Sequence, residues 1–375
     1  MRVALDGVVF QNGYQRGIQR AFRELIPRLP HEIEIVLTLT ERAKAELPSR
    51  TTVAFAGVRA VGLLPRRLRR AVQPALAARG LARIQAECDV FESTYYTLPT
   101  REMPTVVLVH DMIAERAGEF LGGSAPEGEV ERKRVAIEGA TQIIAISAAT
   151  ADDLTRFYPS VRDRVTIVHW GGDHLVREVD QAVIDGAAPG ADRPYVLHVG
   201  DRALYKNFPV LLDALSTDRW PSGLGLVVAG PAWKAEEAAR LDRFPTGRMV
   251  RHVGRPDDGA LRRLYAGAAC VAAPSRIEGF GFSVLEAQSA GAPLVCADTR
   301  VFREIAAGGA LYFDCADPVQ LAQRVAETLE PDVRTRLINA GRDNLVRFSW
   351  ERCAHETARV YQRAAAERVV RFRAH

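Results

Sequence analysis

Short apolar runs alternate with helix-patterned segments along this 375-residue chain, and the alternation constrains its fold more than any other feature. Residues 105–109 (TVVLV) are the clearest run, because five apolar or β-branched residues follow one another without a polar residue between them. Such runs are typical of parallel strands that are covered on both faces. Similar runs lie at 34–39, 195–199 and 224–229. Strands that alternate with helices predict an α/β fold with doubly wound parallel sheets.

The alternation occurs twice, and the pattern weakens between the two halves at residues 175–193, where acidic residues, glycine and proline interrupt it. A chain of 375 residues is also too long for one hydrophobic core and suits two domains. We therefore expect a first domain over 1–175 and a second over 190–354, with a further helix at about 355–375. Two such domains would create a cleft lined by the loops at their strand ends.

Composition places the chain among soluble globular proteins, with 47% hydrophobic and 26% charged residues. The net charge of +4 is too small to indicate a nucleic-acid binder. The five cysteines are scattered without a CxxC pair, which predicts buried thiols in a reducing, cytoplasmic compartment and argues against a zinc site. No secretory signal opens the sequence, and no run reaches 18 apolar residues, so we expect no membrane span.

Two stretches of the first half have the composition of a ligand site. His110 and Asp111 follow the strand at 105–109 directly, and polar residues at the carboxyl end of a central strand are where α/β enzymes keep their chemistry. The histidine could hold a substrate hydroxyl, or it could be purely structural. The loop at 11–16, with Gly13 and Arg16, is either a wall of the cleft or a plain connector.

A basic helical segment at 63–86 carries four clustered arginines beside apolar residues: Arg66, Arg67, Arg69 and Arg70. This pattern suits contact with an anionic membrane surface or an anionic acceptor. It is equally typical of the solvent-exposed face of an amphipathic helix, and the sequence leaves both interpretations open.

In the second half, Arg202 and Lys206 lie in the loop between the strand at 195–199 and a helix that starts near residue 208. Two cations before a helix N-terminus form an anion site, where a diphosphate would gain charge-assisted hydrogen bonds. Solvated surface charges are the alternative interpretation.

Residues 275–286 (SRIEGFGFSVLE) lie between an apolar run and a helical pattern. Gly279 and Gly281 allow the backbone of this turn to approach a ligand closely. Glu278 and Glu286 flank the turn, so that one carboxylate can meet the reactive end of a ligand while the other binds a more distant part. An ordinary turn with solvated acids has the same local spacing.

The longer segment PSRIEGFGFSVLEAQSAGAP resembles the signature of retaining, nucleotide-sugar-dependent glycosyltransferases of family 4, and VLVHDM is similar to the family pattern around its histidine. The resemblance spans most of the chain and is strongest over 195–320. It implies the GT-B fold, in which two Rossmann-like domains face one another across a cleft and the final helix crosses back onto the first domain. It also implies transfer of a sugar from a nucleotide-diphosphate sugar to an acceptor hydroxyl with retention at the anomeric carbon.

The resemblance further assigns donor-binding roles to residues of the second half. Glu286 would bind the ribose hydroxyls, and Arg202 and Lys206 would hold the diphosphate. Glu278 and the backbone of Phe280 and Gly281 would grip the donor sugar. Many family members have arginine directly before the lysine, but Tyr205 stands there in this chain, so Arg202 would have to supply the second charge.

In the first half, the resemblance places His110, with Asp111 beside it, near the reacting carbon. It places the loop of Gly13 at the sugar or the acceptor. No Asp-x-Asp motif stands at a strand end of the second half, so we expect neither a metal ion nor any cofactor besides the donor.

Alternatives in function and partner stay open at this level. A nucleotide-sugar epimerase or a phosphorylase could use the same fold, and so could a non-catalytic nucleotide-sugar-binding protein. The acceptor could be a glycan, a lipid-linked sugar or a small molecule in polysaccharide or glycolipid synthesis. We expect a cytoplasmic protein, with the arginine cluster as a possible contact to the inner face of a membrane. Neither the base nor the sugar of the donor follows from the sequence.

Overall fold

A computed structural model describes residues 1–11, 16–56, 66–116, 128–173, 193–241 and 250–373, without the side chains of 16, 66–73 and 368–373. The chain divides into two compact units. Unit 1 comprises the described residues up to Gly171, apart from Arg116, together with the chain from Trp350 onward; unit 2 holds the described residues of 172–349. None of the helices in these described ranges has the length and hydropathy needed to cross a membrane.

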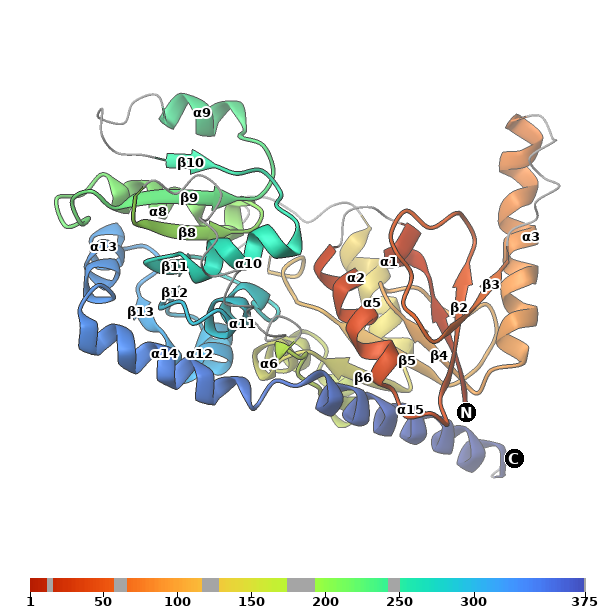
Figure 1. Ribbon diagram of the computed structural model, residues 1–375. Coiled ribbons are helices and arrows are strands. Elements are labelled where there is room, and N and C mark those ends of the chain that lie inside the picture. The colour runs from red at the N-terminus through yellow and green to blue at the C-terminus, as the bar shows by residue number, and fades with distance from the viewer. Residues whose placement is uncertain (12–15, 57–65, 117–127, 174–192, 242–249, 374–375) are drawn as a thin grey trace. The chain divides into compact units, whose positions relative to one another are not determined.

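Unit 1 is built on a parallel sheet in the order β3-β2-β1-β4-β5-β6-β7 (Figure 1). Its strands are β1 (Arg2–Asp6), β2 (Glu34–Leu39), β3 (Thr51–Phe55), β4 (Val90–Ser93), β5 (Thr105–Val109), β6 (Gln142–Ala145) and β7 (Val165–Ile167). Every pairing is parallel, for example Val3 with Ile35 and Val106 with Gln142. The four strands β1, β4, β5 and β6 are almost wholly buried, and for β5 the unbroken run TVVLV predicts this burial.

Helices connect these strands. They are α1 (Val8–Gln11), α2 (Arg16–Leu25), α3 (Arg66–Ala86), α5 (Glu129–Gly139), α6 (Ala148–Phe157) and the C-terminal α15 (Trp350–Arg373), with 3₁₀ turns η1 (Ile26–Arg28) and η3 (Pro159–Arg164). Ser147 is the N-cap of α6, because its hydroxyl accepts a hydrogen bond from Thr150 N at 3.0 Å. The helix α15 packs on unit 1, where the hydroxyl of Tyr361 donates to the buried carboxyl group of Glu92.

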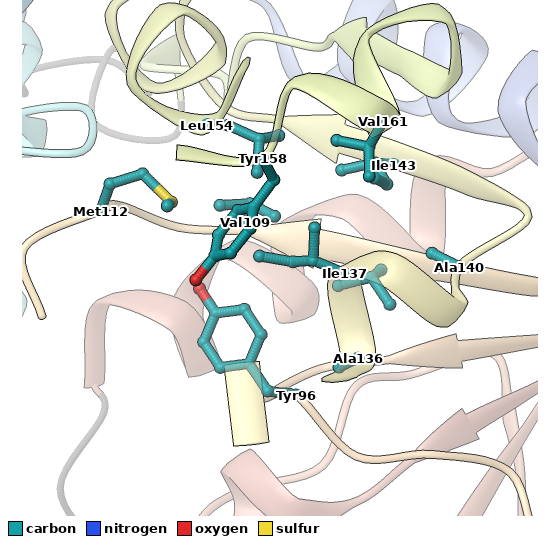
Figure 2. Close-up of a cluster of buried hydrophobic side chains, with 11 residues drawn as sticks. Tyr96, Val109, Met112, Ala136, Ile137, Ala140, Ile143, Leu154, Tyr158 and Val161 are labelled. Atoms are coloured by element: carbon teal, nitrogen blue, oxygen red, sulfur yellow. The ribbon is translucent and has the colours of Figure 1, made fainter. Parts of the chain in front are cut away.

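A buried apolar cluster supports the carboxyl end of β5 (Figure 2). Val107 and Val109 of the strand pack with Ile137 of α5 and Leu154 of α6. Met112, from the loop that follows β5, belongs to the same cluster and is 2% exposed. Burial of side chains of this size stabilises each by about 1.5–3 kcal/mol, so the loop after β5 is tied to the core by its own residue.

Unit 2 repeats the architecture with a parallel sheet in the order β10-β9-β8-β11-β12-β13. Its strands are β8 (Tyr195–Val199), β9 (Gly225–Ala229), β10 (Val250–His252), β11 (Cys270–Ala273), β12 (Leu294–Ala297) and β13 (Leu311–Phe313). Its helices are α8 (Phe208–Leu215), α9 (Ala235–Leu241), α10 (Asp258–Ala266), α11 (Phe282–Ser289), α12 (Arg300–Ala306), α13 (Pro318–Glu327) and α14 (Pro331–Leu345), with 3₁₀ turns η5 (Leu204–Lys206) and η6 (Ala307–Gly309). The prediction of doubly wound α/β architecture is confirmed for each unit.

Among the elements that the sequence pattern does not predict are β3 and α14. The strand β3 lies at the edge of its sheet, and Val53 and Phe55 are 49% and 47% exposed, so its residues show neither a buried run nor a clean alternation. The helix α14 has only a few buried residues, Leu337, Gly341 and Asn344, and lacks a broad apolar stripe. Both elements carry too little apolar pattern for periodicity to reveal them.

Candidate functional site

Ligands of doubly wound sheets bind at the carboxyl ends of the strands, where the strand order reverses. In unit 1 this switch lies between β1 and β4, and in unit 2 between β8 and β11. Most of the described side chains that the sequence singles out follow these strands or their neighbours.

Asp6 organises the switch point of unit 1 at the end of β1. Its carboxylate accepts hydrogen bonds from the backbone of Val8 at 3.1 Å and of Thr94 at 2.9 Å. The hydroxyls of Thr94 and Thr97 donate to it as well. A carboxylate with four donors is fully engaged, so Asp6 fixes the loop after β4 and is not itself free for a ligand.

His110 lies beside that loop with its ring 5% exposed. Its Nε2 lies 2.9 Å from the carbonyl oxygen of Thr94, which can only accept, so Nε2 carries the hydrogen. Nδ1 is buried and has no hydrogen-bond partner in the part of the chain that the structure describes. Burial lowers the pKa of His110 to about 4, against the opposing effect of the Thr94 carbonyl. The ring is therefore neutral at pH 7 and presents Nδ1 as an acceptor for a hydroxyl group.

Aromatic rings and a buried lysine surround this histidine. The rings of Tyr95 and Trp170 lie 6.2 and 5.6 Å from the His110 ring, and the hydroxyl of Tyr96 accepts the backbone N–H of His110 at 3.3 Å. Asp111 is held through its backbone, because Lys133 Nζ donates to its carbonyl oxygen at 2.5 Å. The side chain of Asp111 is 35% exposed.

In unit 2 the central contact of the site joins two of the predicted residues. Lys206, in the loop after β8, forms an ion pair with Glu278, in the loop after β11, with 2.6 Å between Nζ and Oε1. Backbone hydrogen bonding from Arg276 N to Tyr205 O at 2.8 Å joins the same two loops. Burial alone would lower the pKa of Lys206, but the Glu278 carboxylate raises it above its ordinary value, so the ammonium is charged at neutral pH.

Arg202 is engaged more fully than the sequence predicts. Its Nε donates to Glu237 Oε1 at 2.9 Å, and its Nη2 donates to the carbonyl oxygens of Pro231 and Ala232 at 2.9 and 2.7 Å. The guanidinium lies 4.6 Å from the ring centre of Trp233. Nη1 is buried and has no hydrogen-bond partner among the described residues. Its two N–H donors are therefore left for a ligand, and the charge of Arg202 is partly balanced by Glu237.

Glu286 lies in α11, about one turn after the start of the helix, and is 6% exposed. The hydroxyl of Tyr265, from α10, donates to Glu286 Oε2 at 2.6 Å. Tyr265 is fully buried, so it fixes the orientation of this carboxylate. A carboxylate held in one rotamer at the start of a helix is suited to accept hydrogen bonds from paired hydroxyl groups.

The turn that precedes α11 contains a glycine in the left-handed backbone conformation. Gly281 is the N-cap of α11 and has a φ of +91°, a backbone conformation that residues other than glycine rarely adopt. The ring of Phe280 points into the core, 3% exposed and 6.0 Å from the ring of Phe348. The side chain of Phe280 therefore belongs to the core and is not presented to a ligand.

The structure thus brings Lys206 and Glu278 into direct contact and places Arg202, Phe280, Gly281 and Glu286 on the loops or first turns that follow β8 and β11. His110 and Asp111 follow β5 in unit 1. Gly13 and the side chains of Arg16, Arg66, Arg67, Arg69 and Arg70 lie outside the described residues. Within the described ranges, no group of three histidine, cysteine, aspartate or glutamate side chains could hold a metal ion.

Four residues that shape these sites escaped the sequence analysis: Asp6, Lys133, Glu237 and Tyr265. Asp6 follows β1 directly, and its place at a strand end is a signal that could have found it. Lys133 precedes Ala136 and Ile137 by three and four residues, so it shares the buried face of α5. Glu237 and Tyr265 contact partners 35 and 21 residues away, and no local pattern indicates such pairs.

Comparisons with known proteins match both halves of the chain to glycosyltransferase models. The model of the glycosyl transferases group 1 matches residues 184–344, and that of glycosyltransferase family 4 matches residues 12–174. The D-inositol 3-phosphate glycosyltransferase of Xylanimonas cellulosilytica is 30% identical over 291 residues, which cover 72% of this chain and 69% of that protein. The O-antigen chain mannosyltransferase B of Escherichia coli is 25% identical over 285 residues, 73% of this chain and 74% of that protein.

Solved structures show the same fold at lower identity. Sucrose-phosphate synthase from Thermosynechococcus elongatus has a TM-score of 0.75 at 16% identity, over 98% of this chain and 100% of that one. HepE of Anabaena, solved with UDP and glucose, has a TM-score of 0.75 at 18% identity, over 96% of this chain and 99% of that one. The predicted family and fold class are confirmed: the chain belongs to the group 1, family 4 glycosyltransferases and has the GT-B fold.

Proposed function

We propose that this glycosyltransferase moves a sugar from a nucleotide-diphosphate sugar to an acceptor hydroxyl, with retention at the anomeric carbon. The observation that carries the proposal is the Lys206–Glu278 ion pair of 2.6 Å at the switch point of unit 2. It places a cation for a diphosphate against a carboxylate for sugar hydroxyls. The oriented carboxylate of Glu286 follows in the next helix.

The donor roles follow from the chemistry of these groups. Lys206, and Arg202 through Nη1, stabilise the negative charge that develops on the departing diphosphate. Glu286 accepts hydrogen bonds from the ribose hydroxyls. Glu278 and the backbone of Phe280 and Gly281 hold the donor sugar. Because these cations neutralise the leaving group, the proposed reaction needs no metal ion and no cofactor besides the donor.

His110 is proposed to accept a hydrogen bond from a hydroxyl of the transferred sugar. Its neutral ring and its unpartnered Nδ1 suit that contact. The acceptor oxygen forms its bond to the anomeric carbon on the face from which the diphosphate leaves, and a departing phosphate oxygen takes the acceptor proton. No side chain is proposed as a general base. Asp111 stands beside His110 and contributes negative charge near the reacting carbon.

The names of the relatives support a role in glycan, polysaccharide or glycolipid synthesis, because one relative is an O-antigen chain mannosyltransferase and one structural neighbour binds UDP and glucose. We further propose that the protein acts in the cytoplasm. The proposed peripheral contact with the inner face of a membrane would use the arginine cluster at 66–70, whose side chains lie outside the described residues.

A thermal-shift panel tests the donor site. UDP, GDP, ADP and TDP and their common sugars are added to the wild type, to Glu286→Ala and to the exposed control Glu236→Ala. A ligand at a hundred times its dissociation constant adds about 2.7 kcal/mol to the free energy of unfolding. One nucleotide series should stabilise the wild type and the control but much less Glu286→Ala. No shift with any ligand, together with a blank direct binding assay, would contradict the proposal.

The hydrogen bond between Tyr265 and Glu286 gives a sharper prediction. Tyr265→Phe should weaken binding of the matching nucleoside diphosphate about three- to tenfold, because a hydrogen bond to a charged group is worth about 1.5–3 kcal/mol and only part of that orients Glu286. Tyr195→Phe is the matched control, since its hydroxyl donates to the carbonyl of Leu264 on the same helix α10 at 2.8 Å. Isothermal titration calorimetry measures the affinity of each variant for the nucleoside diphosphate. If Tyr265→Phe binds as tightly as Tyr195→Phe and the wild type, Tyr265 does not position Glu286.

A further inference from the structure

Lys133 is a lysine in the core of unit 1. It lies on α5, its side chain is 2% exposed, and its helical neighbours Ala136 and Ile137 belong to the apolar cluster of Figure 2. A buried ammonium group is unfavourable by several kcal/mol unless charged or polar partners surround it. The partners of the Lys133 ammonium group therefore indicate the role of this buried charge.

The Lys133 ammonium group contacts residues that flank or hold His110. Nζ lies 2.9 Å from Glu115 Oε2, 2.5 Å from the carbonyl oxygen of Asp111 and 3.7 Å from Asp111 Oδ1. It also lies 5.2 Å from the ring centre of Tyr96, whose hydroxyl accepts the backbone N–H of His110. Glu115 is itself 2% exposed and lies 3.4 Å from the hydroxyl of Tyr158. One cation thus joins Asp111 and Glu115, which follow His110 in the chain, to the ring of Tyr96, whose hydroxyl holds the His110 backbone.

Stability alone is a weak reason for this arrangement. Replacing a buried ion pair by apolar residues of similar volume is often neutral or stabilising, and α5 is already anchored by Ala136 and Ile137. What apolar packing cannot do is fix the direction of a peptide carbonyl. A charge-assisted hydrogen bond to the carbonyl of Asp111 does so, and it sets the path of the backbone at His110.

We propose that Lys133, paired with Glu115, is a positioning residue that holds the His110–Asp111 backbone in the geometry needed for sugar transfer. The proposal rests on the function proposed above for His110. Lys133 touches no substrate in this account and acts only through the loop after β5. A displacement of about 1 Å at a reacting group can lower a rate by about a hundredfold, so the loss of this hydrogen bond should appear in kcat.

The test uses the double variant Lys133→Met/Glu115→Gln, which removes both charges and leaves no unpaired buried ion. Release of nucleoside diphosphate, with water as the acceptor of the sugar, is measured with each nucleotide sugar of the thermal-shift panel. The variants are then compared on the one that the wild type turns over. We expect kcat to fall about ten- to a hundredfold, while KM for the donor and the affinity for the nucleoside diphosphate change less than threefold. Arg134→Met, on the same helix but in surface ion pairs with Glu131 and Glu138, should keep wild-type kcat.

A second variant covers the case in which the double variant does not fold. Lys133→Arg keeps the charge for Glu115, but a planar guanidinium cannot reproduce the direction of the hydrogen bond to Asp111. We expect it to fold, to bind nucleotide normally and to lose at least fivefold in kcat. If either folded variant turns over within twofold of the wild type, the positioning role is wrong although the transferase function stands. If the wild type releases no nucleoside diphosphate from any sugar of the panel, the proposed function fails and this inference fails with it.

Discussion

Replacing Lys206 by methionine is expected to lower kcat by about a hundred- to a thousandfold, the loss that follows removal of one preorganised group at a site of developing charge. In the structure its ammonium is paired with Glu278 at 2.6 Å, and both side chains are mostly buried, at 21% and 15% exposed. The charge is therefore already in place before a diphosphate arrives, and little reorganisation is needed when the leaving group departs. Steady-state release of nucleoside diphosphate measures the change.

The ion pair also determines how the variant must be controlled. Lys206→Met leaves Glu278 without its partner, so part of any loss could come from that carboxylate. Glu278→Gln measures this part separately, and Lys206→Arg, which keeps a cation, should recover part of the rate. Lys234→Met removes an exposed lysine of the same unit and should have no effect. A kcat for Lys206→Met within threefold of the wild type would show that Lys206 does not stabilise the departing diphosphate.

The strand ends and the signature around α11 could be predicted from the sequence, because each is a pattern of residues that are adjacent in the chain. The five-residue run of β5 directly precedes His110, and the glycines of the 275–286 turn directly precede α11. Parallel sheets then place such residues at one edge of each unit without further information. The contact between Lys206 and Glu278 follows from this rule, since β8 and β11 are neighbours at the switch point.

The remaining parts of the site depend on side-chain direction, which local pattern does not determine. On α5 the lysine at 133 is buried while Val135 is 39% exposed, the reverse of what hydrophobicity alone predicts. The sequence predicts that Arg202 binds a diphosphate and gives no sign of a protein partner for its guanidinium. Glu237, from a helix that starts 33 residues later, takes one of its faces instead. Such pairs form only when tertiary packing brings distant segments together.

Glu92→Gln is expected to make unit 1 less sensitive to alkaline pH. Glu92 lies in β4, 1% exposed, and accepts a hydrogen bond from Tyr361 of α15, while its Oε1 is buried without a partner. Burial raises the pKa of Glu92 to about 8, the hydrogen bond from Tyr361 opposes that rise, and the charge of Asp6 adds to it. The carboxyl group is therefore protonated in the folded protein at neutral pH, although it would be ionised in the unfolded chain.

The sign of the effect follows from proton counting. Between about pH 4.5 and 8 the folded state holds a proton that the unfolded state has released, so the stability of the wild type falls as pH rises through this window. The total is on the order of 3–5 kcal/mol, at about 1.4 kcal/mol for each pKa unit. His110 acts in the opposite direction: because burial lowers its pKa to about 4, it makes stability rise between about pH 4 and 6.5. Above about pH 6.5 the contribution of His110 no longer changes with pH, whereas that of Glu92 continues to change up to about pH 8.

Urea unfolding at pH 5, 6.5 and 8 separates these contributions. Glutamine keeps the shape of Glu92 and can accept the hydroxyl of Tyr361, but it leaves an amide N–H unpaired, so the variant should be about 1 kcal/mol less stable than the wild type at pH 5. At pH 8 it should be more stable than the wild type by several kcal/mol, because it carries no group to ionise. His110 is present in both proteins and cancels from the difference. The exposed control Glu87→Gln should show no such crossover, and a difference for Glu92→Gln that stays constant with pH would mean that Glu92 is ionised in the folded protein after all.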